Sequence, residues 1–192
     1  MGGVVSGLRA EDGRYRALNS PGLQGPHGTT GIVVQINTSF GGVPKYPIPE
    51  CLLTPLGLEG DHHAHPQLHG GPRQAVLVIS AEAIEELHFK GYPVFPGALG
   101  ENLTTRGLDR RQLRIGMQIR AGEALLEITK VRTPCGTLDI FGPAIRQEVY
   151  DKLVKAGDPR SVRWGMSGFY CAVLEPGRVR FNDIIAVVAT VA

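Results

Sequence analysis

Short apolar runs, rich in β-branched residues and bounded by glycine or proline, dominate this chain of 192 residues. Clear examples are GIVVQI (31–36), QAVLVIS (74–80) and ALLEITKV (124–131). Runs of this length and composition are typical of strands, and the 26 glycines and 14 prolines supply the turns between them. The runs do not alternate regularly with helical segments, as they would in a parallel α/β sheet. The sequence therefore predicts a mostly β protein, an antiparallel β-barrel with a few inserted helices.

Further strands are expected at shorter runs separated by glycine turns. They lie near ECLL (50–53) and at ENLTT (101–105), LRIG (113–116), MQIRAG (117–122), GFYCAVLE (168–175) and FNDIIAVVA (181–189). In MQIRAG, apolar and polar residues alternate, which is typical of a half-buried strand. The last two runs are joined around EPGR (175–178), with Pro-Gly as the turn.

Two segments have the period of a helix. AEAIEELHF (81–89) follows Ser80, a good N-cap, and precedes Gly91, a C-terminal stop. A second helix is expected from Pro143 to Gly157, because apolar residues recur there every four positions. They are Ile145, Val149 and Leu153.

Composition bounds the class of protein. Residues 1–29 show no period and are expected to be a flexible tail, and residues 30–192 to form a single barrel domain, as a monomer or homodimer. The net charge of +2 does not indicate a nucleic-acid partner, and no apolar run is long enough to span a membrane. Three cysteines without a CxxC pair, and no secretory segment at the start, favour a cytoplasmic location.

Cys135 has the most informative local sequence. It lies in VRTPCGTL (131–138), directly after a strand and after Pro134, which cannot continue a hydrogen-bonded ladder. Lys130 and Arg132 are two positions apart and could present positive charge beside the thiol, which favours the thiolate. The pattern predicts a functional cysteine. The other two cysteines are expected to be buried and inert, and they are Cys51 and Cys171.

A histidine-rich segment and a glycine-rich segment are weaker candidates. Four histidines and an aspartate crowd into residues 61–69. His65 and His69 have the spacing of HExxH, but Pro66 argues against the helix that this motif needs. A polar loop is the simpler interpretation, although an extended loop could still hold a metal through Asp61, His63 and His65. The segment FPGALGENLTTRGL (95–108) could bring backbone amides close to a ligand, but it has no nucleotide-binding signature.

Taken together, the separated motifs resemble those of the MOSC domain, the C-terminal domain of molybdenum cofactor sulfurase, which also occurs alone. The resemblance runs from about Gly31 to Val188. The matching pieces are Gly60-Asp61, His69-Gly70-Gly71, Gly100-Glu101-Asn102-Leu103, Arg132-x-Pro134-Cys135 and Gly168 to Gly177. One departure is Asn182-Asp183, where the family usually has Gly-Asp. Because asparagine tolerates positive φ, this difference should leave the site unchanged.

The resemblance implies a β-barrel that binds molybdenum cofactor (molybdopterin), with Cys135 as a molybdenum ligand or a carrier of sulfur. Relatives include reductases of N-hydroxylated compounds, such as hydroxylamines, amidoximes and modified nucleobases. We expect cofactor contacts from the basic and loop residues of the motifs, namely Lys130, Arg132, Arg73, Gly70, Gly71 and Asn102. Oxygen leaves the substrate as water, so an acid is needed, and the candidates are Asp61, His69 and Glu101.

Three classes of function follow. The first is a molybdenum-dependent oxidoreductase that acts on a small-molecule substrate and takes electrons from a separate electron-donor protein, since the chain has no ferredoxin-like cysteine set. The second is a sulfur-carrier or cofactor-binding module in which Cys135 holds a persulfide without redox turnover. The third is a metal-binding protein that uses the histidines of its loop, which are His62, His63, His65 and His69.

Overall fold

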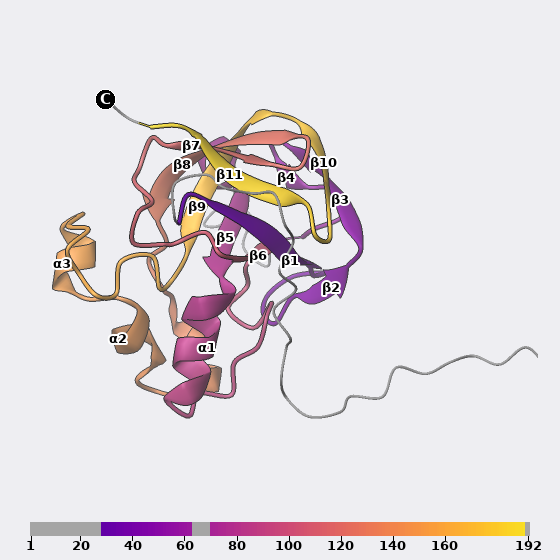
Figure 1. The fold of residues 1–192 in the computed structure, drawn as a ribbon. Helices are drawn as coiled ribbons and strands as arrows, with labels where there is room; N and C mark the ends of the chain where they lie inside the picture. Colours follow the sequence, from indigo (N-terminus) through magenta and orange to yellow (C-terminus); the bar gives the residue numbers. More distant parts are fainter. Residues whose placement is uncertain (1–27, 63–69, 191–192) are drawn as a thin grey trace, which may run out of the picture.

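A closed β-barrel forms the body of the protein in the computed structural model, which describes residues 28–62 and 70–190 (Figure 1). Within these residues, seven strands form the barrel: β1 (Thr30–Thr38), β5 (Val76–Ser80), β6 (Leu103–Arg106), β7 (Gln118–Ala121), β8 (Ala124–Val131), β9 (Phe169–Glu175) and β11 (Ile184–Ala189). Their order is β11-β7-β8-β9-β5-β6-β1, and pairing of β1 with β11 closes the ring. The predicted barrel is therefore confirmed.

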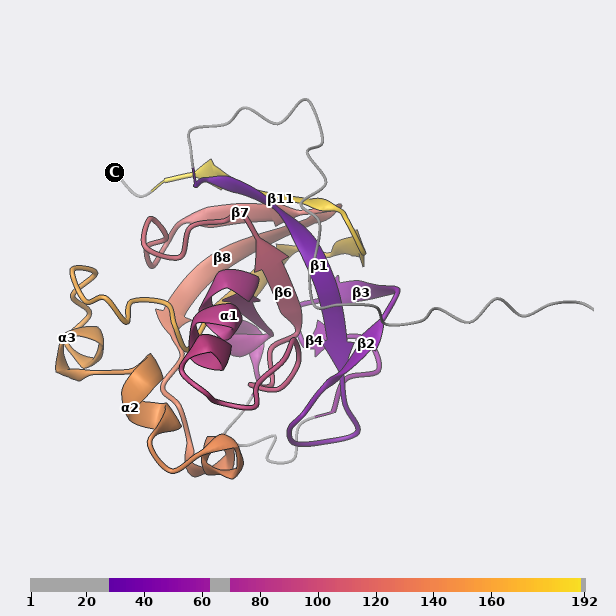
Figure 2. The same ribbon diagram turned by 60° about the horizontal axis from the view of Figure 1, so that its bottom comes forward.

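The barrel is mixed, so the expectation of a purely antiparallel sheet is wrong. Strands β5 and β6 run parallel, with Val78 opposite Leu103. The helix α1 (Ala81–Phe89) lies between these strands in the sequence and covers them in space (Figures 1 and 2). A helical crossover returns the chain to the starting end of the sheet, and two strands joined in this way run parallel.

The remaining strands extend the main sheet or form a small second sheet beside the barrel. Strand β2 (Tyr46–Ile48) pairs with β1, while a second sheet contains β10 (Gly177–Arg180), β3 (Glu50–Thr54) and β4 (Gly57–Leu58) in that order. The Pro-Gly turn expected at 175–178 is not observed, because Gly177 is the first residue of β10, which pairs with β3 and forms an additional strand before β11. Positive φ at Asn182 (68°), in the turn before β11, agrees with the expected tolerance of asparagine there.

Several strand boundaries and one whole strand differ from the sequence prediction: β6 is Leu103–Arg106 instead of 101–105, and β11 starts at Ile184 instead of 181. LRIG (113–116) forms a turn instead of a strand. The Gly116 amide donates to the Ile128 carbonyl at 2.7 Å, and the indole Nε1 of Trp164 donates to the Leu113 carbonyl at 2.9 Å. The strand expected at 74–80 starts at Val76, because Pro72–Gln74 form the 3-10 helix η1. Residues 1–27 of the expected tail lie outside the described residues, and the Thr29 carbonyl already accepts from Val187 of β11 at 2.8 Å.

Helix α1 begins as expected. The Ser80 hydroxyl accepts from the Ala83 amide at 3.2 Å, and Gly91 follows the helix with φ 89°. Ala83, Ile84 and Leu87 are buried against the barrel wall. Among the described residues, no helix is both long enough and apolar enough to cross a membrane.

The single helix expected at 143–157 is wrong. The structure has α2 (Ile145–Val149) and α3 (Lys152–Lys155), separated by Tyr150 in extended conformation. Asp151 caps α3 by accepting from the Val154 amide at 2.8 Å and from the Ser161 hydroxyl at 2.7 Å. The break rotates the apolar stripe, so that Val154 is buried and Leu153 is 47% exposed.

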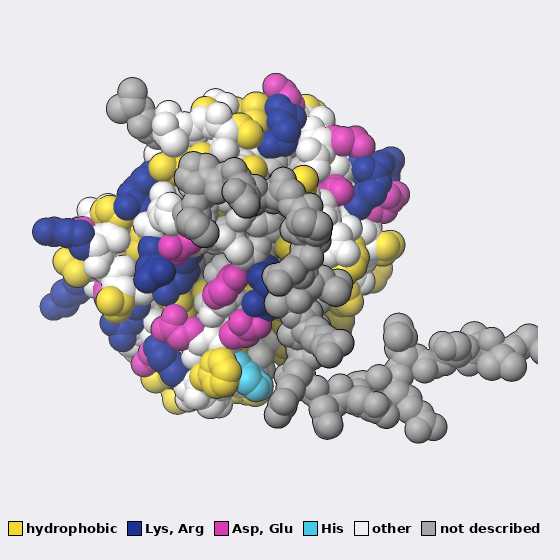
Figure 3. Space-filling model, viewed as in Figure 1, with side chains coloured by type: hydrophobic (Ala, Val, Ile, Leu, Met, Phe, Trp, Pro, Cys, Tyr) yellow, Lys and Arg dark blue, Asp and Glu magenta, His cyan; other side chains and the backbone are white. Residues whose placement is uncertain are grey.

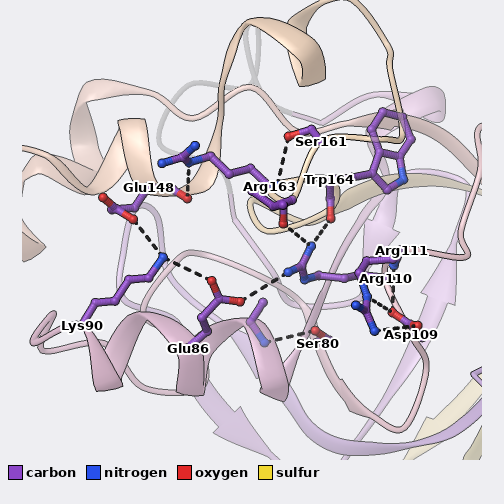
Figure 4. A network of polar contacts seen from close by, with 12 residues as sticks. Ser80, Glu86, Lys90, Asp109, Arg110, Arg111, Glu148, Ser161, Arg163 and Trp164 are labelled. Carbon is purple, nitrogen blue, oxygen red and sulfur yellow. Dashed lines mark hydrogen bonds and ion pairs between the residues drawn. The ribbon is translucent and has the colours of Figure 1, made fainter.

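A polar network fastens this helical region to α1 (Figure 4). Lys90, at the end of α1, contacts Glu86 and Glu148, and Glu86 also pairs with Arg110 at 3.3 Å. Arg110 in turn donates to the carbonyl of Trp164. The network therefore joins α1 to α2 and to the loop that contains Trp164.

Candidate thiol and cofactor site

Cys135 lies where the chain leaves β8 and turns into the 3-10 helix η2 (Gly136–Phe141). Two hydrogen bonds fix the start of this turn: the Arg132 amide donates to the Gly168 carbonyl at 2.9 Å, and the Ser167 hydroxyl donates to the Arg132 carbonyl at 2.6 Å. A side chain at Gly168 would clash with Ile79 and the Val78 carbonyl, so the close approach requires glycine. The Leu138 amide then donates to the Cys135 carbonyl at 3.2 Å.

The thiol of Cys135 is partly exposed, and its surroundings favour the thiolate. Burial opposes ionisation, but the hydroxyl and amide of Thr137 and the charge of Arg132 outweigh it, so the pKa of the thiol lies below its ordinary value. The sulfur lies 2.7 Å from the Thr137 hydroxyl. Cys135 is therefore an accessible and ionisable thiol, as the sequence predicts.

The other cysteines provide the contrast. Cys51 and Cys171 are both buried, as expected, and both lie in the core of the barrel. Burial raises the pKa of Cys51 to about 12 and raises that of Cys171 as well. Neither is a nucleophile at neutral pH.

Arg132, beside Cys135, and Glu101, which interacts electrostatically with Arg132, each carry a buried atom without a hydrogen-bond partner in the described residues. These atoms are Nη1 of Arg132 and Oε2 of Glu101. Arg132 is 5% exposed and Glu101 is fully buried. Burial raises the pKa of Glu101, and its hydrogen bonds and the charge of Arg132 offset this only in part. Buried polar atoms are rarely left unpaired in proteins, so this pair marks a place prepared for a polar ligand.

Tyr170 belongs to the same cluster, although no sequence motif indicated it. It lies on β9. Burial raises the pKa of its hydroxyl, and the positive charge of Arg132 counteracts this only in part. The ammonium of Lys130 lies over its ring, 5.2 Å from the centroid. Thr137 was also missed, although its position two residues after Cys135 could have indicated it. A tyrosine inside a strand has no such local signal.

Asp61 and Asn102 form a second, closely packed group. Asp61 Oδ1 accepts from the Ser39 amide at 2.9 Å, and its Oδ2 accepts from Lys45 and from the Asn102 amide group. Burial lowers the pKa of Lys45, and the charge of Asp61 counteracts this. The Asn102 side chain also accepts from the Leu77 amide at 3.0 Å. The Asn102 side chain therefore connects Asp61 to β5. Lys45 was missed because its partner is distant in the sequence.

The glycine-rich loop before Asn102 folds around Glu101. Oε1 of Glu101 accepts from the Gly97 amide and from the Thr104 hydroxyl, the latter at 2.9 Å. Gly97 has φ 94°, and a side chain there would clash with the Lys45 carbonyl. Gly97 thus allows this loop to pack against the backbone of Lys45, and Oε2 of Glu101 is buried without a hydrogen-bond partner among the described residues.

The remaining candidates lie around the first turn of η1. Gly70 and Gly71 have φ 95° and 83°, which favours glycine. The side chain of Arg73 is 72% exposed and lies 3.7 Å from Glu127. His69 lies outside the described residues, as do His63 and His65. In the part of the chain that the structure describes, no group of three or more His, Cys, Asp or Glu side chains could hold a metal ion.

A shallow groove runs beside the loop that carries Cys135. Its volume is about 200 Å³, and it is lined by Thr133, Pro134, Arg146, Gln147 and Tyr150. The loop after β8 forms one wall and α2 forms the other. The structure therefore brings Cys135, Arg132, Lys130 and Glu101 into one region, which is linked to Asp61 through the adjoining residue Asn102.

This barrel, with an ionisable cysteine after one of its strands, has the arrangement that the sequence motifs imply. The profile of the MOSC domain matches residues 65–186, more than half of the chain, and the chain belongs to the MOSC domain family.

Individual relatives are similar to parts of the chain. Protein YiiM of Escherichia coli (strain K12) is 38% identical over 98 residues, which are 47% of this chain and 42% of YiiM. The uncharacterized protein YflK of Bacillus subtilis (strain 168) is 36% identical over 142 residues, 72% of this chain and 59% of YflK. The chain thus spans about half the length of these curated relatives. The crystal structure of YiiM from Escherichia coli matches with a TM-score of 0.61 and 27% identity, covering 84% of this chain and 71% of that one.

Proposed function

We propose that this protein binds molybdenum cofactor through Cys135 and reduces N-hydroxylated small molecules. One observation carries the proposal: an accessible thiol of lowered pKa lies beside Arg132, whose buried Nη1 has no partner among the described residues. A thiolate is a soft ligand that suits a metal already held by sulfur. A buried guanidinium that has no carboxylate of the described residues within ion-pair distance favours an anionic group. Membership of the MOSC family supports the same ligand.

The residues present fit this cofactor. Cys135 would supply the metal ligand, while Arg132 would hold an anionic part of the cofactor and Lys130, exposed on the same side, would add positive charge. Arg73, with its exposed side chain, could reach a phosphate. The bound cofactor would supply the two-electron chemistry that removes oxygen from an N–OH group.

Glu101 is the best placed of the expected proton donors. Burial raises its pKa, which favours the protonated form, and its Oε2 has no partner within the described residues. Asp61 is better suited to positioning, because both of its oxygens already accept hydrogen bonds. We retain Asn102, Gly70 and Gly71 as cofactor contacts through the loops that they shape, and His69 as a further proton donor. A separate protein would supply the electrons.

Metal and pterin content tests the proposal directly. Protein produced in a host that makes molybdopterin should contain about one molybdenum and one pterin per chain. Cys135→Ser should lose most of the molybdenum while remaining folded, because an exposed thiol contributes little to packing. Cys51→Ala, which removes a sulfur from the core, is the matched control and should retain the metal. Equal molybdenum in the wild type and Cys135→Ser would contradict the assignment of the ligand.

The same lowered pKa favours one alternative, in which Cys135 carries a persulfide without redox turnover. A thiolate is the form that accepts sulfur from another carrier. Treatment with cyanide would then release one thiocyanate per chain from the wild type and none from Cys135→Ser. Thiocyanate release from protein free of molybdenum, without reductase activity, would favour this alternative.

A further inference from the structure

The distribution of unpaired positive charge differs from one side of the molecule to the other. Most described Lys and Arg side chains lie within ion-pair distance of a carboxylate. In residues 28–62 and 70–190, those that form no such pair are Arg114, Lys130, Arg132, Lys152 and Lys155. All but Arg114 lie on the β8 exit or on α3.

Three of these five remain available to an external partner. Arg114 donates to the carbonyls of Arg111 and Leu113, and Arg132 is buried. Lys130, Lys152 and Lys155 are exposed, and the last two lie one turn apart on α3. Figure 3 shows cationic side chains projecting at the edge where α3 lies, whereas positive and negative side chains lie side by side at the opposite edge.

Exposed apolar side chains accompany these lysines. Leu153, between them on α3, is 47% exposed, and Val162 is 75% exposed. The hydrogen bond from Ser161 to Asp151 holds Val162 beside the start of α3. We call the exposed side chains of Lys152, Leu153, Lys155 and Val162 the α3 face.

The α3 face is close to the thiol site along the chain and in space. Tyr150, two residues before α3, lines the groove whose other wall is Thr133 and Pro134, the residues that precede Cys135. The Thr133 hydroxyl lies 3.4 Å from that of Tyr150. Helices α2 and α3 project from the barrel on this side (Figures 1 and 2). A protein bound to the α3 face would therefore lie next to the loop of Cys135.

We propose that the α3 face is the docking site of an acidic electron-donor protein. The inference rests on the proposed function, which needs electrons from a separate protein. Unpaired lysines around exposed apolar residues suit a small, transient interface, in which opposite charge speeds encounter and the apolar contact holds the pair briefly. Carboxylates on the donor would supply the partners that Lys152 and Lys155 do not have in this chain.

A flavodoxin, an acidic carrier of flavin mononucleotide, serves as the probe. The variant Lys152→Gln/Lys155→Gln removes two charges from exposed helix positions and keeps good helix formers. The variant Arg120→Gln/Arg178→Gln is the matched control, since it removes two charges from β7 and β10, which lie away from α3 in the upper part of Figure 1. Affinity for flavodoxin is measured at low and at high salt, and turnover of the loaded protein is measured with reduced flavodoxin and with reduced methyl viologen.

The lysine variant should bind flavodoxin about tenfold more weakly at low salt, and the difference should disappear at high salt. Its turnover should fall similarly with flavodoxin and stay unchanged with methyl viologen, which needs no docking. The control should match the wild type in every assay. If the lysine variant binds and turns over with flavodoxin as well as the wild type does, the docking site is refuted. If the wild type shows no turnover with methyl viologen, the proposed function fails, and the binding measurements alone decide the docking site.

Discussion

At the scale of single residues, the Thr137 hydroxyl has the most direct effect on the reactive thiol. It lies 2.7 Å from the sulfur and helps to lower the pKa of Cys135. Thr137→Val removes this contact at nearly constant shape, so the pKa should rise and the rate of alkylation should reach half of its maximum at a higher pH. Iodoacetamide labelling followed by mass spectrometry, from pH 6 to 10, measures this for each cysteine.

Two comparisons make that result specific. Thr133→Val removes a hydroxyl that contacts Tyr150 rather than the thiol, so its alkylation profile should match the wild type. Cys51 and Cys171 should not react in the folded protein, because both are buried and their pKa values are raised. An unchanged profile for Thr137→Val would show that the hydroxyl does not stabilise the thiolate.

Glu101 should make the stability of the protein depend on pH. Because burial raises its pKa in the folded state, its contribution to the free energy of unfolding is complete below the ordinary pKa, about 4.3, and is lost as the pH rises through the folded value. Glu101→Gln keeps the Oε1 acceptor for Gly97 and Thr104 but cannot ionise. The difference in unfolding free energy, variant minus wild type, should therefore grow from pH 4 to pH 8.

Urea unfolding at several pH values tests this effect of Glu101. Glu59→Gln, at an exposed position, is the control and should leave the pH dependence unchanged. Glu101→Ala leaves the Gly97 and Thr104 donors without their acceptor and should lower stability by about 1–3 kcal/mol. Parallel pH curves for the wild type and Glu101→Gln would contradict a raised pKa.

At the scale of secondary-structure elements, the break between α2 and α3 depends on Asp151. Asp151→Ala removes the acceptor for the Val154 amide and for the Ser161 hydroxyl, and the loss of an N-cap typically costs about 1 kcal/mol. Asp151→Asn keeps an oxygen for the amide and should lose less. Chemical denaturation compares the two variants. Equal stability of Asp151→Ala and the wild type would show that the cap is unimportant.

The elements that the sequence predicted are those determined by local pattern. Strands β8 and β9 and helix α1 have their periodicity or their cap within a few residues, as Ser80 shows. The cap at Asp151 is also local, since its carboxylate accepts from the Val154 amide, but Ser161 contacts the same carboxylate from ten positions away, and the apolar period in 143–157 indicates neither. The parallel pairing of β5 with β6 depends on where α1 places the chain.

The residues of the candidate site likewise divide into those that the local sequence indicates and those that only the fold brings together. Cys135 and its basic neighbours could be recognised because proline, cysteine and arginine are close together in the sequence. Tyr170 and Lys45 could not, because their contacts with Arg132 and Asp61 join segments 38 and 16 positions apart. Where the motifs of a family combine distant segments, as for Glu101 and Arg132, resemblance indicated what periodicity alone did not.

At the scale of the whole molecule, closure of the barrel depends on close contacts along β1. This strand pairs with β11 at one end and with β6 and β2 towards the other. At Gly31, opposite Ile185 of β11, a Cβ atom would lie 2.2 Å from the Arg106 carbonyl oxygen and 2.7 Å from the Leu108 amide nitrogen. Both are backbone atoms, so the clash could be relieved only if β1 and β6 moved apart where the barrel closes.

Gly31→Ala should therefore destabilise the whole barrel, by about 1–3 kcal/mol, as overpacking of a close contact usually does. Gly136→Ala is the matched control, because its Cβ would meet only the Asp139 carboxylate at 3.8 Å and Gly136 lies outside the barrel. Because the strands form one ring, the loss should appear as a single cooperative shift of the unfolding midpoint in both circular dichroism and Trp164 fluorescence. A transition of Gly31→Ala that matches the wild type, or one that separates between the two signals, would show that β1 does not limit the stability of the closed barrel.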